Sequence, residues 1–504
     1  MAMNHIFRLS SLSSSLAASW LSSVDDEDED EDEERRMADP ELRLWEAEVL
    51  WESGNRNLAI EILKAHRSEI VDTDDRILLS RVTLTIGEWL DHERVERPKV
   101  LWEKYFNKAA VLLQTATISA MPSSSTSPLS SFSSSSSSAA VAAAWTGKAL
   151  NVLGTFAERQ CEELLATIDD EAASAVRLQK SNELKACQQA ILEASSSGNG
   201  GGSELARLKG ILRRLEAQVS SDEAEMKTTQ TDIGGFLQIA VWAFAQCLEI
   251  SDSFDNSVYS LVSLIMTHAN MPEMGTILLA NTPMERIASR KFLPLAHQLC
   301  ARLSTDETPF HSMLKRLVYR MAVEYPYHVL NHLFALRNAN RTSSASSSGG
   351  GGKGKGKSES DIMEEKRCRA AEGILMQVRA TDSDLKGIVD AVDQMCEAYI
   401  ELAVSSVPEK YRNTKLVNKI IGFSSKMRIS RLLQNLPPNI PVFTARPTTG
   451  IPGDYGCVPF ISSMSEGYSL AGGINLPKIL RVLGSDGQRY KQLVKGKDDM
   501  RQDA

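Results

Sequence analysis

The sequence lacks several features that mark common protein classes. Aromatic residues make up 6% of the 504 residues, and the seven cysteines are scattered along the chain, never spaced as Cys-x-x-Cys. Such cysteines predict buried, reduced thiols rather than a disulfide framework. No apolar run approaches the roughly 20 residues that span a bilayer. The net charge of −9 gives no overall basic field of the kind that nucleic-acid-binding proteins carry. The composition therefore favours a mostly helical protein in a reducing compartment, with no membrane partner.

Four stretches of low complexity divide the chain. A run of ten acidic residues, Asp25–Glu34, follows a serine-rich start, Met1–Ser23, that contains Arg8 but no acid. Such compositions cannot bury enough apolar surface to offset the entropy of ordering them. We therefore expect residues 1–39 to be a disordered extension, with an organelle transit peptide as the alternative for its first part. The same argument predicts disordered insertions near residues 121–140, 195–203 and 342–360, where the other serine- and glycine-rich tracts lie.

Between these stretches, apolar residues recur with helical spacing. Leu42, Trp45 and Val49 fall at i, i+3 and i+7, and a similar series that includes Ala59 and Leu63 follows the turn residue Gly54. This pattern predicts two helices joined by a turn. Further helices are predicted over Ile77–Leu90, Leu101–Leu113, Phe236–Leu248, Val258–Thr267, Phe310–Met321, Leu330–Phe334, Ile374–Val378 and Ile388–Leu402. Successive helical hairpins are typical of an α-solenoid, which we predict for residues 40–436.

The character of the sequence changes after Leu436. Six prolines between Pro437 and Pro459 exclude helix there and predict a linker over residues 437–457. Short strands are predicted at Val458–Ser463, Lys478–Leu483 and Gln488–Val494. Gly484-Ser485-Asp486-Gly487 joins the last two, and an Asp-Gly pair accepts the positive φ of a tight turn. The predicted fold is thus mostly α: an α-solenoid followed by a small antiparallel β-sheet in residues 458–504.

The last predicted strand suggests nucleotide binding. Side chains alternate along a strand, so Leu493 and Lys495 share one face. There Leu493 could lie beneath a base while Lys495 reaches the phosphates. The connection Leu470–Pro477 contains paired glycines, which allow a close backbone approach to a ligand. A hairpin loop without function is the simpler interpretation of this connection, because it matches neither common phosphate-loop motif.

Acidic residues follow the strand lysine. Asp498 and Asp503 could act as counter-ions that hold Lys495 in place, an arrangement found in phosphoryl-transfer enzymes. The alternative is an exposed helix start, in which Asp498 and Asp499 complement the helix dipole.

These residues bring a known family into view. The segment Leu470–Ala504, which contains LAGGINLPK and QLVKGKDDMRQDA, strongly resembles the start of the kinase domain in the phosphatidylinositol-3-kinase-related protein kinases, and most of all their ATM-like branch. Lys291–Leu303 (KFLPLAHQLCARL) and Phe310–Arg341 resemble the helical FAT region that precedes that domain. The resemblance covers roughly residues 40–504, with gaps at the insertions.

The resemblance implies an ATP site. The loop of Leu470, Ala471, Gly472, Gly473, Ile474, Asn475 and Leu476 matches the family's glycine-rich loop over the ATP phosphates. Pro477 and Leu493 match positions that line the adenine slot, and Lys495 matches the phosphate-binding lysine. Asp498 and Asp503 match acids that orient this lysine. ATP with Mg²⁺ or Mn²⁺ is the implied cofactor of the full-length enzyme.

The resemblance also implies an activity and partners. A relative of this kind would be a serine/threonine-protein kinase that transfers the ATP γ-phosphate to Ser or Thr followed by Gln. It would act in DNA double-strand-break signalling and repair in the nucleus, with break-sensor proteins as partners and a homodimer formed through the helical region. The alternative is a non-catalytic helical-repeat scaffold for dimerisation or partner binding. The match over Lys291–Arg341 argues against a third option, a lipid kinase of the wider superfamily.

Parts of the family pattern have no match. We find no counterpart of the catalytic loop or of the Asp-Phe-Gly segment, so the sequence offers no catalytic residue. We therefore expect the chain to be a fragment that is inactive alone. His328 and His332 are spaced as metal ligands on one helix face, but ordinary packing is the favoured interpretation because no third ligand is evident. Lys353, Lys355 and Lys357 alternate with glycine and are expected to form a solvated linker.

Overall fold

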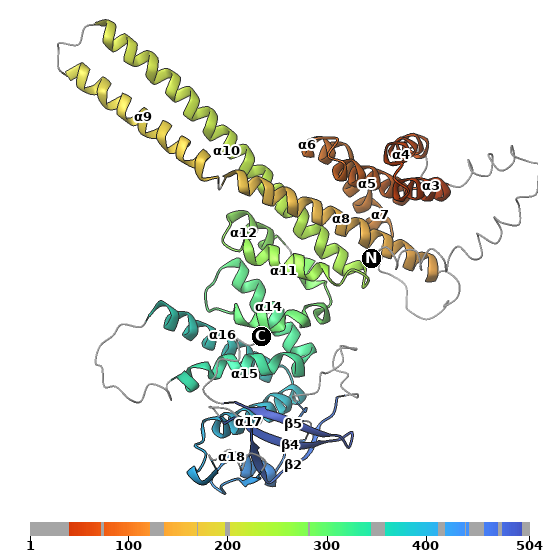
Figure 1. Cartoon of the computed structure of the whole chain (residues 1–504), viewed down its shortest axis with the longest axis vertical. Helices are drawn as coiled ribbons and strands as arrows, with labels where there is room; N and C mark the ends of the chain where they lie inside the picture. The colour runs from red at the N-terminus through yellow and green to blue at the C-terminus, as the bar shows by residue number, and fades with distance from the viewer. Residues whose placement is uncertain are drawn as a thin grey trace, which may run out of the picture. The chain divides into compact units, whose positions relative to one another are not determined.

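The protein divides into two compact units, residues 1–153 and 154–504. The computed structural model, drawn in Figure 1, describes residues 40–71, 75–120, 136–168, 170–196, 202–280, 283–343, 358–411, 419–438, 440–442, 458–471 and 476–495. Helix α8 (Ser136–Ile168) runs through the boundary between the units.

The first unit is a series of helices that pack on their neighbours in sequence. They are α3 (Pro40–Glu52), α4 (Arg56–Ile70), α5 (Arg76–His92), α6 (Pro98–Leu101), a π-helical turn (Trp102–Phe106) and α7 (Asn107–Ala120). Gly54 turns the chain between α3 and α4 with φ = 92°, which side chains with a Cβ rarely allow. The aromatic rings of Trp51 and Trp89 stack at 4.5 Å and hold the end of α3 against α5.

The apolar spacing predicted α3 but not its buried face. Leu42, Trp45 and Val49 are 38%, 49% and 47% exposed, whereas Leu44 and Ala47 are almost fully buried. The helix therefore turns its smaller apolar face towards α4.

Helix α10 (Gly202–Ile250) forms the spine of the second unit. Its first half lies antiparallel beside α9 (Glu171–Ser196), as Figure 1 shows. Its second half packs against α11 (Ser257–Thr267) and α12 (Pro272–Leu279). The predicted helix Phe236–Leu248 is thus the buried end of a much longer one. By length and composition Leu205–Ile250 could cross a membrane, but half of its most apolar window is buried inside the protein. The core contacts account for its apolar character.

The array continues to the sheet through helices that pack in sequence. They are α13 (Ala296–Ala301), α14 (Pro309–Glu324), α15 (Pro326–Ser343), α16 (Glu359–Thr381) and α17 (Ser383–Val404), with 3₁₀ turns at Pro283–Glu285, Ser289–Leu295 and Glu409–Tyr411. The predicted apolar face from Phe310 to Met321 is buried, and Pro326 opens a new helix as expected. Asp382 caps α17 by accepting a hydrogen bond from the Leu385 amide at 2.7 Å.

The sheet consists of β1 (Ile421–Gly422), β2 (Ile461–Met464), β3 (Gly467–Leu470), β4 (Lys478–Gly484) and β5 (Arg489–Val494), with α18 (Arg428–Gln434) between β1 and β2. All its pairings are antiparallel. Strand β5 occupies one edge of β4, and β3 and β2 share the other edge. An apolar core that includes Met395 and Leu402 joins one face of the sheet to α17.

The predicted fold class is confirmed: helical hairpins precede a small antiparallel sheet. The hairpin of β4 and β5 is confirmed as well, with Gly487 at φ = 75°. Strands β1 and β3, helix α18 and the α9–α10 pair were not predicted. The serine- and glycine-rich tract Ser195–Ser203 falls at the turn of that pair, and its two ends lie within the helices.

Candidate functional site

The described candidate residues meet at one end of three adjacent strands. Leu470 of β3 pairs with Lys478 of β4, which pairs with Val494 of β5. One residue further, the Ala471 amide donates a hydrogen bond to the Pro477 carbonyl at 2.7 Å. The same register places Pro477 opposite Lys495. Ala471, Pro477 and Lys495 therefore form a row across the sheet, although the first and last are 24 residues apart in sequence.

The face of the sheet that points away from α17 has a composition suited to a base. Leu493 lies there, 59% exposed and paired with Ile479, whereas Gln492 and Val494 are buried on the opposite face. The alternation predicted for the last strand is thus confirmed. Leu493 and Ile479 form a small apolar patch on this face, which could accept the flat ring of a base. The half-buried Lys495 follows on the same face, where its ammonium group could meet phosphates.

A rigid turn fixes the register of the two strands that carry this patch. The Asp486 carboxylate accepts hydrogen bonds from the Gln488 amide at 3.0 Å and from the Tyr490 hydroxyl at 2.5 Å. The bond from Tyr490 lowers the pKa of Asp486. A Cβ at Gly484 would lie 2.4 Å from the Asp486 carboxylate, so a larger residue there would displace this carboxylate from its hydrogen bonds. The register of β4 and β5 places Lys495 opposite Pro477.

The opposite face of the sheet is anchored to α17 by a buried lysine. The Lys478 ammonium donates to the carbonyls of Leu402, of Ala403 at 3.3 Å and of Ser405 at 2.7 Å. These carbonyls close the C-terminus of α17, where a positive charge is favourable. Burial lowers the pKa of Lys478 to about 8, because removal from water disfavours the charged form. Lys478 belongs to the row next to the candidate site, so the site end of the sheet is also its point of attachment.

A second polar contact joins α17 to β5. The Tyr399 hydroxyl donates to Gln492 Oε1, and burial raises the pKa of Tyr399. Among the described residues, Gln492 Nε2 has no hydrogen-bond partner. The oxygen of the Gln492 amide thus has a hydrogen-bond partner and its nitrogen has none within the described chain. The contact with Tyr399 therefore sets the orientation of the amide.

Some of the predicted site residues lie outside the described residues. They are Gly472, Gly473, Ile474 and Asn475 of the loop, and Asp498 and Asp503 after the strand. Their predicted roles remain predictions. The loop's two ends are described: Leu470 is buried at the end of β3, and Leu476 has a positive φ of 44°.

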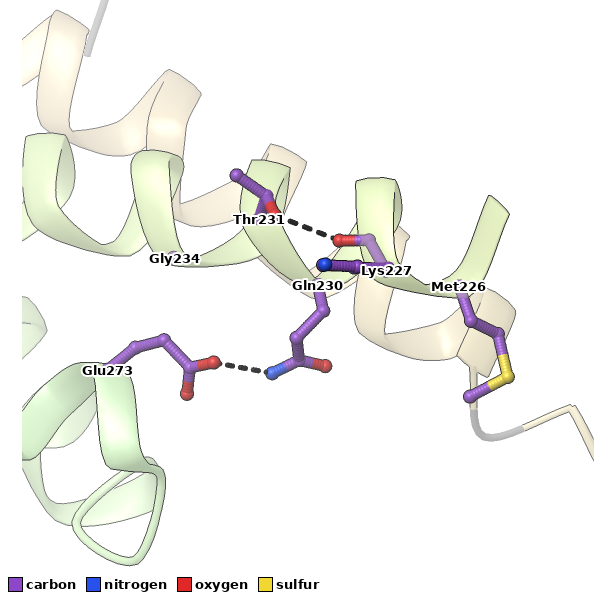
Figure 2. Close-up of a pocket in the computed structure, with 6 residues that line it drawn as sticks. All are labelled: Met226, Lys227, Gln230, Thr231, Gly234 and Glu273. Carbon is purple, nitrogen blue, oxygen red and sulfur yellow. Dashed lines mark hydrogen bonds between the residues drawn. The ribbon is translucent and has the colours of Figure 1, made fainter. Parts of the chain in front are cut away.

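A separate groove lies between α10 and α12. It has a volume of about 500 Å³ and is lined by Met226, Lys227, Gln230, Thr231, Gly234 and Glu273 (Figure 2). Figure 2 shows the Gln230 amide directed at the Glu273 carboxylate, to which it donates at 2.8 Å. A Cβ at Gly234 would lie 3.1 Å from the Glu273 side chain, so the helices approach closely there. None of the predicted site residues lines this groove. In the part of the chain that is described, no group of three or more His, Cys, Asp or Glu residues gathers as metal ligands.

Sequence comparison supports the resemblance seen at this sheet. No family model matches the chain. It is 27% identical to the serine-protein kinase ATM of Sus scrofa over 482 residues, which are 92% of the chain and 14% of that protein. It is 28% identical to the serine/threonine-protein kinase ATM of Arabidopsis thaliana over 477 residues, 92% of the chain and 11% of that protein. Over nearly its whole length the chain is similar to a small part of ATM kinases.

Solved structures of the same group share the fold. The FAT and kinase domain of CtTel1 covers 92% of the chain with a TM-score of 0.66 and 22% identity, and the chain covers 28% of that structure. The open conformation of CtTel1 aligns with a TM-score of 0.67 at 22% identity, over 92% of this chain and 15% of that one. The chain thus spans a small part of the ATM and Tel1 proteins that it matches, a part that includes helical and sheet elements.

Lys478 and its contacts with α17 were missed by sequence reasoning. A signal was present, because Lys478, Leu480 and Val482 alternate on the inward face of β4. A lysine at the first inward position of a strand requires buried acceptors. Only the fold shows that these acceptors are the last carbonyls of a helix about 75 residues earlier.

Proposed function

We propose that the chain is part of an ATM-like serine/threonine protein kinase, with a FAT-like helical array and the ATP-binding end of the kinase domain's first sheet. The row of Ala471, Pro477 and Lys495 supports this proposal, because at this end of the sheet the exposed Leu493 shares one face with Lys495, as nucleotide binding would require. The relationship to ATM and Tel1 supports the reaction, transfer of the ATP γ-phosphate to protein Ser or Thr. Lys495 binds phosphate, and Asp498 and Asp503 orient it.

The metal ion, the substrate sequence and the place of action are proposed from the similarity to ATM kinases. The nucleotide arrives with Mg²⁺ or Mn²⁺, the accepting Ser or Thr precedes Gln, and the kinase acts in the nucleus on signals from DNA-break sensors. The printed 504 residues contain no Asp-Phe-Gly segment. A protein of these residues alone is accordingly expected to transfer no phosphate from labelled ATP to a Ser-Gln peptide.

Nucleotide binding can be tested without kinase activity. An acyl-phosphate derivative of ATP transfers its acyl group to a lysine beside the phosphates, and mass spectrometry identifies the modified residue. We expect labelling of Lys495 that excess ATP suppresses. Lys491, which is exposed and lies four residues earlier on the same face, is the matched control and should be labelled weakly with or without ATP. Equal labelling of both lysines, unaffected by ATP, would count against the site.

A second function, self-association, is favoured by a different observation. Two of the similar structures are described as dimers, a complete CtTel1 dimer with C2 symmetry and a Tel1 kinase butterfly symmetric dimer. The helical array of this chain would then act as a dimerisation scaffold. Light scattering on the whole chain should give twice the monomer mass. A monomer at high concentration would contradict the scaffold but leave the nucleotide site standing.

A further inference from the structure

The groove between α10 and α12 contains a carboxylate that has a donor at only one of its two oxygens. Glu273 Oε1 accepts the hydrogen bond from the Gln230 amide at 2.8 Å. Glu273 Oε2 is shielded from solvent and, among the described residues, has no hydrogen-bond partner. Figure 2 shows one carboxylate oxygen facing Gln230 and the other turned away from it. A carboxylate oxygen that is removed from water without a donor is destabilising, so the groove favours a ligand that supplies one.

The walls of the groove hold this carboxylate close to α10. A Cβ at Gly234 would lie 3.1 Å from the Glu273 side chain, so the glycine lets α12 approach the backbone of α10. The Thr231 hydroxyl donates to the Lys227 carbonyl at 2.8 Å and is therefore engaged within its own helix. Lys227 lines the groove but forms no hydrogen bond with Glu273 Oε2. Met226, 40% exposed, supplies an apolar wall.

The part of α10 that borders the groove is acidic. Residues 222–232 contain four acids and one lysine, a net charge of −3. Lys180 pairs with one of these acids, Asp222, at 2.7 Å, whereas Glu223 and Glu225 are exposed. Such a stretch attracts a cation towards the groove. A metal ion does not suit it, because Glu273 is the single carboxylate of the lining and hard cations take six or more oxygen ligands.

A guanidinium group meets these requirements better than an ammonium group. It is planar, carries five N–H donors and is more weakly hydrated, so it loses less when it leaves water. The end of a glutamate side chain rotates easily, and an entering guanidinium can therefore turn Glu273 Oε2 towards itself. Gln230 also lines the groove, and its carbonyl oxygen is a second acceptor. The aliphatic stem of an arginine can pack on Met226.

The space around Met226 suits a protein segment rather than a free small molecule. A second hollow of about 600 Å³ adjoins the groove, since Met226 lines both. It lies between the start of α9 and α10, where Ala172, Ala173 and the half-exposed Val176 give it apolar lining. An extended segment that crosses Met226 can place an arginine in the groove and an apolar side chain in the hollow. Side chains two positions apart in such a segment point the same way.

We propose that the groove between α10 and α12 binds the guanidinium group of an arginine from an extended segment of a partner protein. Glu273 is the carboxylate that receives the guanidinium, and Met226 lies beneath the segment. An apolar residue two positions from the arginine occupies the neighbouring hollow.

Peptide binding to the whole chain tests the ligand. The probe is the peptide Ac-Ala-Leu-Ala-Arg-Ala-amide, followed by saturation-transfer NMR, which detects weak ligands. The same peptide with citrulline in place of arginine keeps the shape without the charge and should bind at least fivefold more weakly. A lysine version should bind about threefold more weakly. Equal affinity of the arginine peptide with either of these would overturn the assignment to a guanidinium group.

Agmatine distinguishes the two sources of a guanidinium group. It carries this group on a four-carbon stem but has no flanking residues to cross Met226, so it should bind about fivefold more weakly than the arginine peptide. Agmatine binding as tight as that of the peptide would assign the groove to a free guanidinium compound and overturn the protein segment as occupant.

Substitutions locate the binding site. Glu273→Gln keeps an acceptor for the Gln230 amide but removes the charge, and should reduce the affinity for the arginine peptide to that for the citrulline peptide. Glu223→Gln is the matched control: it removes the same charge from an exposed position of α10 that does not line the groove, and should change binding less than twofold. Met226→Ala, at an exposed side chain whose loss the fold tolerates, should weaken binding about threefold. Equal losses for Glu273→Gln and Glu223→Gln, or unchanged binding by Met226→Ala, would overturn the site.

Discussion

At the scale of single residues, two buried lysines do the same work at different places. Lys291 donates to the carbonyls of Leu248 and Ser251 at 2.7 and 2.8 Å, at the end of α10. Lys478 does the same at the end of α17. The last carbonyls of a helix have no partner within the helix, and they carry the negative end of its dipole. A lysine from a neighbouring element satisfies both needs, and each lysine thereby ties a later segment to an earlier helix.

The first prediction concerns Lys291. Its side chain is 2% exposed and also pairs with Asp252 at 2.9 Å and Asp255 at 3.0 Å. Lys291→Met leaves the carbonyls of Leu248 and Ser251 without their buried donor and removes the cation beside Asp252 and Asp255, and should lower the free energy of unfolding by about 3 kcal/mol. Urea unfolding followed by circular dichroism measures this loss.

Arg290 provides the matched control. It pairs with the same Asp252 at 2.7 Å, but the arginine and aspartate are 35% and 68% exposed. Arg290→Met should therefore cost less than about 1 kcal/mol. Equal losses for the two variants would show that burial does not distinguish the two cations.

The second prediction is a pH dependence at Lys478. Burial lowers its folded-state pKa to about 8, whereas an unfolded lysine titrates near ~10.4. Between these values the unfolded chain binds more protons, so stability should rise with pH. The penalty for burying the charge is fully present below pH 8 and is relieved above it.

The comparison with Lys478→Met, which does not titrate, isolates this effect. The native chain should gain stability relative to the variant from pH 8 to pH 10, as measured by urea unfolding at intervals of one pH unit. A constant difference would mean that the three carbonyls of α17 outweigh burial and keep the lysine charged.

At the scale of elements, the spacing of apolar residues predicted where helices lie, but not always which of their faces are buried. The face from Phe310 to Met321 was recognised because one side of α14 is apolar and the other polar. In α3, the helically spaced residues include Trp45, which is exposed, and the helix buries Leu44 and Ala47 instead. Periodicity reports that one face is apolar, whereas the partner helix decides which apolar face is used.

The α9–α10 pair was missed although its pattern is present. Leu205, Leu208, Leu212, Leu215 and Val219 alternate spacings of three and four, as in a coiled coil. The glycine- and serine-rich tract before them favoured a loop. The two ends of this tract, Ser195–Ser196 and Gly202–Ser203, belong to the helices α9 and α10.

The third prediction tests how closely α8 and α10 cross. A Cβ at Gly154 of α8 would lie 2.8 Å from the Phe244 ring of α10, and that ring is fully buried. Gly154→Ala should destabilise the protein by about 2 kcal/mol, because the ring has no space to move. Thermal unfolding measures this change.

Gly210→Ala is the matched control within a helix. Nothing lies within 4 Å of the added methyl group, and alanine is the better helix former by ~1 kcal/mol. This variant should be as stable as the native chain or more so. If Gly210→Ala destabilised the protein, the added methyl group would meet a contact that the structure does not show.

At the scale of the whole molecule, the candidate site depends on contacts that no local pattern contains. Strand alternation correctly placed Leu493 and Lys495 on one face. The position of Ala471 and Pro477 beside Lys495 depends on the registers of two strand pairs, and one of these strands, β3, was not predicted. The attachment of Lys478 to α17 depends on a separation of about 75 residues. Register and long-range packing are set by the whole fold, so candidate residues could be named from the sequence but their arrangement could not be predicted from it.

The last prediction follows from this attachment. Met395 of α17 is fully buried in the core that joins this helix to the sheet. Met395→Ala should lower the free energy of unfolding by about 3 kcal/mol, since it leaves a cavity. If α17 and the sheet form one cooperative unit, amide hydrogen exchange should accelerate in β4 and β5 as much as in α17. Met376→Ala on α16, where the side chain is 61% exposed, should change neither quantity. Faster exchange in α17 with unchanged exchange in β4 and β5 would show that the sheet keeps its stability when its core with α17 is weakened, and would contradict a single cooperative unit.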